Sequence, residues 1–260
     1  DREEATYKME YTGGDDNDIE VGVKTPLEGN GDFRNQEGLN LLDECDIVVT
    51  NPPFSEYRSY VATLIEHDKK FIIWSNNNSI TYKEIFPLLK NNKMWLGYTA
   101  NKTLIFRIPD YYEKWDEKET AKMNDGHHYA KVPAISVFTN LDITKRHEKL
   151  ILWKNYTPEE YPNFDNYQGI NVNKVSEIPI DYDGVMGVPF IYLDSYNPEQ
   201  FEIVGLGTSR ELYTPIKQYI NPKKYFNDGR IVSANEINST LTYRIDKSDV
   251  KKVYYKADNV

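Results

Sequence analysis

The sequence predicts an α/β protein built on a doubly wound sheet that is closed by an antiparallel edge. Short apolar runs rich in β-branched and aromatic residues, Ile47 to Val49 and Phe71 to Trp74, have the length of buried strands. Each run is followed by a segment with apolar residues at helical spacing, first 55–67 and then 79–89. The order strand, helix, strand, helix and then a hairpin is typical of this fold class.

The other elements follow from alternation and turn signals. Ser55 is expected to cap the 55–67 helix. The remaining predicted elements are a hairpin over 7–12 and 19–24, a helix over 35–44, the closing hairpin over 94–98 and 104–108, a loop over 110–130 and a last strand over 134–138. After residue 144 the pattern changes to a second, irregular α+β module, with short strands expected near 188–193, 201–205 and 241–245. We therefore expect two domains, 1–145 and 146–260.

Composition excludes several classes of protein. The 260 residues are 39% apolar and 28% charged, which is ordinary for a globular chain of one large or two smaller domains. Cys45 is the one cysteine, so no internal disulfide can form and a reducing, cytoplasmic setting is expected. No apolar run approaches the roughly 18 residues of a membrane span, and no signal peptide is visible. The chain begins with Asp1, so we expect it to continue a longer protein.

The candidate catalytic segment is Asn51-Pro52-Pro53-Phe54, directly after the first buried strand. The edge of an open α/β sheet at the carboxyl ends of its strands is where ligands bind. The Asn51 side-chain oxygen and the Pro52 carbonyl can accept both N–H bonds of an exocyclic amine and aim its lone pair at an electrophilic methyl, while Phe54 stacks on the ring. The alternative is a strand-terminating turn with a packed phenylalanine.

Other candidate residues lie further along the chain. Asn76, at the end of the next strand, is expected to line a pocket for the target base, unless it belongs to a plain loop. Basic clusters occur from about residue 145 onward and mark where phosphates would dock, with a solvated surface as the alternative: Lys145, Arg146, Lys223 and Lys224. The net charge of −10 is unfavourable for a nucleic-acid binder unless positive charge is segregated. His127 and His128 have no neighbouring ligands, so no metal site is predicted.

Several sequence blocks resemble the EcoRI-like adenine-specific DNA methyltransferases. In order, these blocks are Gly31-Asp32-Phe33-Arg34, Asn51-Pro52-Pro53-Phe54, the segments 80–86, 138–142 and 145–146, Asp181 to Pro189, and Tyr196 to Phe201. They span residues 31 to about 205 in the order and spacing of the family, and the 181–189 block is the most specific.

The resemblance implies a Rossmann-like methyltransferase fold, S-adenosyl-L-methionine as cofactor, and methyl transfer to N6 of an adenine flipped out of duplex DNA. It implies that Asp32 contacts the adenine of the cofactor and that Phe33 packs on it. It also implies a C-terminal recognition module that reads DNA and a role in a restriction-modification system. The glycine-containing cofactor loop and the first strands of the sheet are expected upstream of Asp1.

We therefore predict a site-specific DNA adenine-N6 methyltransferase, with no metal and no membrane partner and with a monomer slightly favoured. Three alternatives stay open at this point. One is an N-methyltransferase that acts on RNA or on a protein glutamine. The second is a DNA-binding protein with an inactive methyltransferase domain, and the third is a non-catalytic assembly subunit. The recognised DNA sequence is not deducible from these residues.

Overall fold

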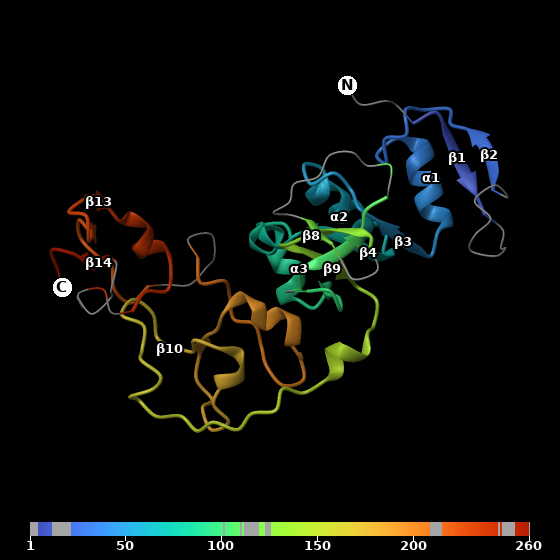
Figure 1. The fold of residues 1–260 in the computed structure, drawn as a ribbon. Coiled ribbons are helices and arrows are strands. Elements are labelled where there is room, and N and C mark those ends of the chain that lie inside the picture. Colours follow the sequence, from blue (N-terminus) through green and yellow to red (C-terminus); the bar gives the residue numbers. More distant parts are fainter. Residues whose placement is uncertain are drawn as a thin grey trace. The chain divides into compact units, whose positions relative to one another are not determined.

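A computed structural model gives the fold (Figure 1) and describes residues 5–11, 22–100, 102–109, 111, 120–122, 126–208, 215–243, 245 and 253–259. The architecture is mixed α/β with several small sheets. The chain divides into two compact units, one formed by residues 1–75 with 138–141 and the other by 76–137 with 142–260. The boundary predicted at 145/146 was drawn between a catalytic domain and a recognition module, and it stays a prediction.

The first unit contains the expected strand, helix, strand sequence. Strand β3 (Ile47–Thr50) leads through a loop to helix α2 (Tyr57–Glu66), which returns to strand β4 (Lys70–Asn76). β3 and β4 are parallel, with Thr50 opposite Ile73. The predicted cap is wrong: the helix begins after Glu56, without a side-chain capping bond.

Helix α2 covers strand β4 with a tightly packed apolar layer. The buried side chains of this layer are Tyr57, Val61, Leu64, Phe71, Ile73 and Phe138. The Tyr57 and Phe138 rings lie 5.8 Å apart, in the tilted arrangement that aromatic pairs prefer. At the start of β4, the Asn140 side chain accepts from the Phe71 amide at 2.9 Å and donates to the Lys69 carbonyl at 2.9 Å.

Two further elements of the first unit agree with prediction. Strands β1 (Tyr7–Glu10) and β2 (Val23–Pro26) pair as an antiparallel hairpin, whose connecting residues 12–21 lie outside the described part. Helix α1 (Gln36–Glu44) begins at Asn35, whose side chain accepts from the Gly38 amide at 2.7 Å. None of the α1 side chains is fully buried.

The four-stranded sheet has the order β3-β4-β9-β5, where β9 is Ile135–Thr139 and β5 is Trp95–Leu96. The predicted closing hairpin is wrong, because β5 lies in this sheet while β6 (Leu104–Arg107) pairs antiparallel with β8 (His128–Val132). β7 (Thr120–Lys122) joins β8 from its other side. The loop expected over 110–130 therefore contains strand, and residues 110, 112–119 and 123–125 lie outside the described part.

The helix expected over 79–89 is split into two. A 3₁₀ helix, η2, spans Asn77–Thr81, and helix α3 spans Phe86–Lys90, so residues 82–85 separate the two. Pro87 explains the break, since proline fits the first turn of a helix but removes a hydrogen bond from its interior.

The later part of the second unit is irregular, as expected, but its strands differ from those predicted. Its elements are η3 (Thr144–His147), β10 (Ile170–Asn171), η4 (Val175–Glu177), β11 (Met186–Gly187), η5 (Phe190–Ser195), β12 (Lys223–Phe226), β13 (Ile231–Ser233), η6 (Asn235–Ser239) and β14 (Val253–Lys256). The strand expected over 188–193 is wrong, because Pro189 starts a 3₁₀ helix there. The strands expected over 201–205 and 241–245 are also wrong for the described residues, since 201–205, 241–243 and 245 pair with no strand and 244 is not described.

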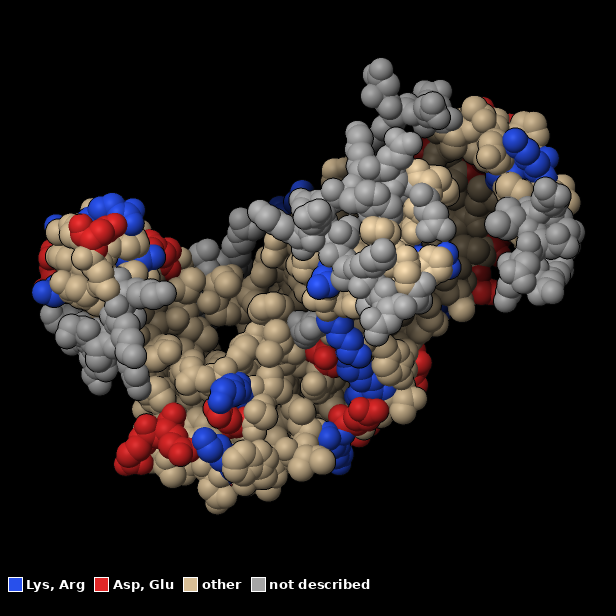
Figure 2. Space-filling view, viewed as in Figure 1, with Lys and Arg blue, Asp and Glu red and all other residues tan. Residues whose placement is uncertain are grey.

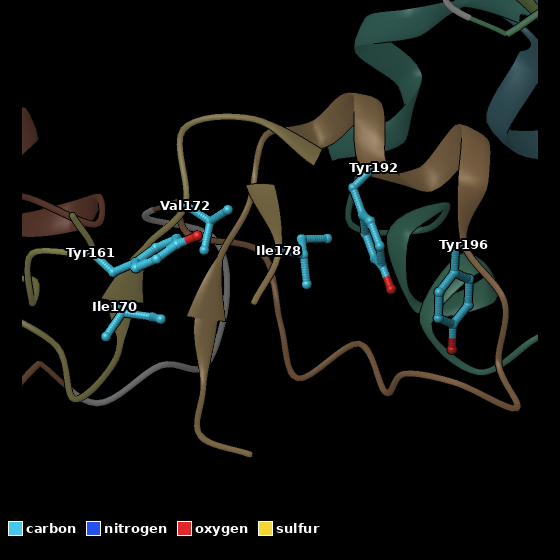
Figure 3. Close-up of a cluster of buried hydrophobic side chains, with 6 residues drawn as sticks. All are labelled: Tyr161, Ile170, Val172, Ile178, Tyr192 and Tyr196. Atoms are coloured by element: carbon cyan, nitrogen blue, oxygen red, sulfur yellow. The ribbon is translucent and has the colours of Figure 1, made fainter. Parts of the chain in front are cut away.

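A cluster of tyrosines and aliphatic residues forms the core of the middle of this unit. Figure 3 shows Ile178 between a group formed by Tyr161, Ile170 and Val172 and a second group formed by Tyr192 and Tyr196. The apolar residues are spread over loops and short helices, so burial here holds together a region with little regular structure. A second, smaller cluster consists of Tyr219, Ile237 and Ile245.

Candidate active site

The loop at the carboxyl end of β3 has the geometry that its sequence predicts. Thr50 ends the strand, residues 51–53 form the loop, and a turn closed by the Glu56 amide on the Pro53 carbonyl at 2.9 Å starts α2. Pro52 is buried and anchors the loop, whereas the Asn51 side chain is exposed. The Phe54 ring is 47% exposed, which is high for an aromatic side chain.

Two hydrogen-bond acceptors of this loop have no partner within the described residues. The structure shows no hydrogen bond to the Asn51 side chain or to the Pro52 carbonyl in that part of the chain. They are next to each other in sequence and beside the exposed Phe54 ring. Within the described residues the loop therefore has two acceptors without a partner, of which the Asn51 amide is exposed, and an exposed aromatic ring, which together match a planar ligand that carries an amino group.

Tyr60 supports the loop from α2. Burial raises the pKa of the Tyr60 phenol above its ordinary value, and a hydrogen bond with Thr50 partly opposes that rise. The contact ties α2 to the last residue of β3, just before Asn51. Sequence reasoning placed Tyr60 on the apolar face of the helix and missed this role, because the partner of its hydroxyl depends on the pairing of helix and strand.

An apolar cavity of about 280 Å³ lies between α1, β3 and α2 in the first unit. Its lining residues are Phe33, Gly38, Leu41, Leu42, Cys45, Ile47, Val48, Tyr60, Thr63 and Leu64. The Phe33 and Tyr60 rings are 4.6 Å apart at 59°. The volume is close to the lower end of small-molecule pockets, roughly 300 Å³, so the cavity suits one flat ring system.

Asp32, beside this cavity, is held by an arginine that sequence reasoning did not single out. Arg34 donates from Nε to Asp32 Oδ1 at 2.9 Å and from Nη2 to Oδ2 at 2.6 Å, and its Nη1 reaches Glu56 Oε2 at 3.3 Å. The two side-chain bonds from Arg34, together with a bond from its backbone amide to Asp32 Oδ1 at 2.9 Å, lower the pKa of Asp32 to about 2. The pair joins the turn at Gly31, whose φ is 74°, to the start of α2.

Three of the candidate residues of the second unit that were assigned to base or phosphate contacts have internal partners. Asn76 caps η2, accepting from the Asn78 amide at 2.8 Å. Lys145 forms an ion pair with Asp194. Arg146 stacks on Trp95 with its Cζ 3.9 Å from the ring centroid, and it donates to the Asn92 side chain at 2.7 Å.

Burial lowers the pKa of the Arg146 guanidinium, although it stays charged at any physiological pH. The contacts of Lys145 and Arg146 fasten η3 to β5 and η5, which are all elements of the second unit. Their assignment to DNA phosphates stays a prediction, and the structure adds a packing role for both.

Lys223 and Lys224 lie on strand β12, where Lys223 is exposed and Lys224 is half-buried. Among the described residues, no three His, Cys, Asp or Glu side chains gather as metal ligands would. None of the helices in the described ranges combines the length and apolar character that a membrane crossing requires.

Comparison with known proteins identifies the family of this chain. The family model described as "Adenine-specific methyltransferase EcoRI" matches residues 1–256. The chain belongs to the EcoRI adenine-specific methyltransferase family. The resemblance read from the sequence blocks is confirmed.

Three curated relatives of this family are named type II methyltransferases. M.EcoRI of Escherichia coli is 48% identical over 179 residues, covering 68% of this chain and 55% of the relative. M.MgeORF184P of Mycoplasma genitalium is 43% identical over 188 residues, covering 70% and 58%. M.MpnI of Mycoplasma pneumoniae is 42% identical over 182 residues, covering 69% and 57%. The matched part of the chain thus spans a little over half the length of these relatives. No solved structure matches the chain.

In this family member, the 181–189 block makes close contacts within the second unit. Asp181 accepts from the Tyr156 amide at 2.7 Å and from the Asn155 side chain at 3.2 Å. Gly187 pairs with Asn171 in the short parallel bridge of β10 and β11, where an added Cβ would lie 2.4 Å from Phe164. The block that is most specific for the family therefore has a structural role that depends on close packing.

Proposed function

We propose that this protein is a site-specific DNA adenine-N6 methyltransferase that uses S-adenosyl-L-methionine, in a restriction-modification system. The observation that carries the proposal is the pair of acceptors without a partner in the described part of the chain, Asn51 Oδ1 and the Pro52 carbonyl, at the carboxyl end of β3 in a chain of an adenine-specific family. A DNA substrate and a single cysteine are consistent with action in the cytoplasm.

The chemistry follows from the electronic structure of adenine. Its N6 lone pair is delocalised into the ring, so the amine is a poor nucleophile. When Asn51 and Pro52 accept its two N–H bonds, the nitrogen moves toward tetrahedral geometry and positive charge that develops on it is stabilised. Phe54 stacks on the purine and fixes its orientation. Because the target lies inside a stacked duplex, the base must be flipped into this loop.

The residues beside the Phe33 cavity fit part of the cofactor. The cavity walls are apolar and two of them are aromatic, as the adenine of S-adenosyl-L-methionine requires. When bound, the cofactor supplies the electrophilic methyl group. Phe33 would pack on its adenine, and Asp32, held in place by Arg34, would face its amino group as the sequence resemblance implies. Within the described residues, this cavity accounts for the adenine end alone.

The sheet is part of the proposal as well. We assign it to a Rossmann-like methyltransferase sheet with further strands next to β3. In the described part of the chain β3 ends the sheet, and its Ile47 and Val49 are 48% and 66% exposed. Parallel strands are normally covered on both faces in such folds, and an exposed apolar edge strand is unusual. Residues 146–260 form the proposed recognition module. Duplex DNA is the proposed partner of the basic residues from 145 onward, among them Lys145, Arg146 and Lys223, and Asn76 is proposed to face the flipped base.

Methyl transfer from labelled S-adenosyl-L-methionine to duplex DNA, RNA and protein tests the substrate class. We expect the full-length protein to label duplex DNA, on adenine N6 after nucleoside digestion. Label that appears only in RNA or protein would point to the N-methyltransferase alternatives. Salt-dependent DNA binding without any methyl transfer would point to an inactive domain.

Substitution of Asn51 tests the site. Asn51→Ala removes one of two acceptors that matter most in the transition state, so the single-turnover rate should fall by about a hundred- to a thousand-fold. The constants for cofactor and DNA should move far less. Asn51→Asp keeps an acceptor and should retain part of the activity. Asn163→Ala, at an exposed asparagine of the second unit, is the matched control. A near wild-type rate for Asn51→Ala would make the loop merely structural.

A further inference from the structure

The strand register of the C-terminal sheet divides its side chains between two faces. Strand β12 pairs antiparallel with both β13 and β14, with Tyr225 opposite Tyr254 and Lys223 opposite Lys256. Residues that are paired across antiparallel strands point to the same side of the sheet. One face therefore carries Lys223, Tyr225, Ile231, Ser233, Tyr254 and Lys256, and we call it the Tyr225 face. The opposite face carries Lys224, Val232, Val253 and Tyr255, together with Phe226.

Side-chain contacts agree with this division. The Tyr225 and Tyr254 rings stack 5.0 Å apart at 8°, and Lys256 Nζ lies 5.5 Å and 5.6 Å from their centroids. Lys224 Nζ instead lies 5.3 Å from the Phe226 ring and 5.7 Å from the Tyr255 ring.

Among the described residues, the side chains that pack on a core cluster belong to one of the two faces. Tyr255 packs against the buried cluster of Tyr219, Ile237 and Ile245, so the face with Lys224 is turned toward the interior of this region. On the Tyr225 face, Lys223 and Lys256 are exposed and Ile231 is 55% exposed. The outer face thus presents a flat aromatic pair with a lysine on each of two neighbouring strands.

The two lysines of this face lie directly opposite each other. Like charges in that position destabilise a sheet. Within the described residues neither Lys223 nor Lys256 forms an ion pair, whereas Lys145 and Lys154 are paired with carboxylates. Figure 2 shows places on the visible side of the molecule where Lys or Arg groups lie next to Asp or Glu groups. In a chain of net charge −10, two adjacent uncompensated lysines are arranged as an anion site would require.

We propose that the Tyr225 face docks the sugar–phosphate backbone of duplex DNA, with one phosphate held between the ammonium groups of Lys223 and Lys256. The inference rests on the proposed function and adds the surface at which the DNA backbone is bound. A phosphate between the lysines cancels their repulsion, and the stacked tyrosines form a rigid support beside it. Contacts to phosphate fix the position of the duplex but carry no sequence information. Of the two lysines that the sequence singled out on β12, Lys223 makes this contact and Lys224 does not.

The test is the salt dependence of binding by the full-length protein to a short fluorescein-labelled duplex, followed by anisotropy. The variants are Lys223→Gln with Lys256→Gln, and Lys224→Gln as the matched control on the same strand. Loss of one phosphate contact should lower the slope of log K against log salt by about one, equally for cognate and unrelated duplexes. Lys224→Gln should leave the slope unchanged. Since the double change removes a repulsion, its melting temperature should not fall.

An unchanged slope in the double variant, or an equal loss in Lys224→Gln, would overturn the assignment of this face. A probe of single-stranded RNA that competes better than duplex DNA would overturn the choice of partner. Methyl transfer by the wild-type protein distinguishes a failure of this inference from a failure of the proposed function. If it methylates and binds DNA while the double variant behaves like wild type, only the Tyr225 face is wrong. If it neither methylates nor binds DNA, the proposed function fails and this inference fails with it.

Discussion

Asn166 holds together two distant segments of the second unit, and its replacement should loosen that region selectively. The side chain is fully buried. Its Nδ2 donates to the carbonyls of Thr240 at 2.7 Å and Ile237 at 3.2 Å, and its Oδ1 accepts from the Thr242 amide at 2.9 Å. These bonds join residues that are more than seventy positions apart in the sequence.

The expected loss of stability in Asn166→Ala depends on which buried groups lose a hydrogen-bond partner. The Thr242 hydroxyl lies 2.9 Å from the Ile237 carbonyl and 3.0 Å from the Thr240 carbonyl, and its single proton is shared between these two acceptors. The buried Thr242 amide keeps no partner among the described residues, and an orphaned buried group costs about 1 to 3 kcal/mol. With the weaker loss at the two carbonyls, we expect a total of about 2 to 4 kcal/mol.

Hydrogen exchange measures this cost without requiring two-state unfolding of the whole chain. The amides of Ile237 and Thr242 should exchange about thirty- to a thousand-fold faster in Asn166→Ala, because 1.36 kcal/mol is a factor of ten. The amides of β4 in the first unit serve as an internal reference. Asn163→Ala, at an exposed asparagine nearby in sequence, is the matched control. Unchanged protection at Thr242 in Asn166→Ala would refute the reasoning.

Two other predictions concern ion pairs and stacking. The pKa of Asp32 is lowered from 3.8 to about 2, so the stability that its pairing with Arg34 contributes is complete above the unfolded pKa and is lost as pH falls toward 2. In Arg34→Gln the pKa of Asp32 should return toward its ordinary value, which carboxyl-detected NMR titration measures, and an unshifted pKa would exclude Arg34 as the cause. Arg146→Lys keeps the charge but loses the planar stacking on Trp95, so the melting temperature should fall while DNA affinity stays close to wild type. An unchanged melting temperature would show that the stacking of Arg146 on Trp95 does not stabilise the fold.

The sequence predicted the parts of the fold that depend on local pattern. Strands β3 and β4 and helix α2 carry strong apolar periodicity, and the structure has them close to the expected positions. Pairing partners were harder to predict, because β5 and β6 look like a hairpin in sequence but each pairs with a strand from after residue 127. A strand's partner is fixed by tertiary packing, which one sequence does not display.

In the candidate site, too, local sequence features were predictable and long-range contacts were not. The loop from Asn51 to Phe54 was predicted because its chemistry is carried by consecutive residues. The contact of Arg34 with Glu56, and that of Arg146 with Trp95, join residues twenty-two or more positions apart and leave no pattern in the sequence. Lys223 and Lys224 could not be told apart either, because the strand that separates them onto two faces was not predicted.

A comparison of asparagines shows why Asn51 is the residue to which we assign chemistry. Asn35 and Asn76 cap helices, and Asn140 and Asn166 bridge backbone groups, so each of these amides is used by the fold itself. Asn51 has no such partner within the described residues, and exposure alone would make that unremarkable for a polar side chain. Its position differs from that of an ordinary surface asparagine, because a buried proline fixes the backbone directly after it and an exposed aromatic ring lies three residues on. We therefore propose that this loop serves an external ligand, with the amino group of adenine at the two acceptors and the purine ring on Phe54.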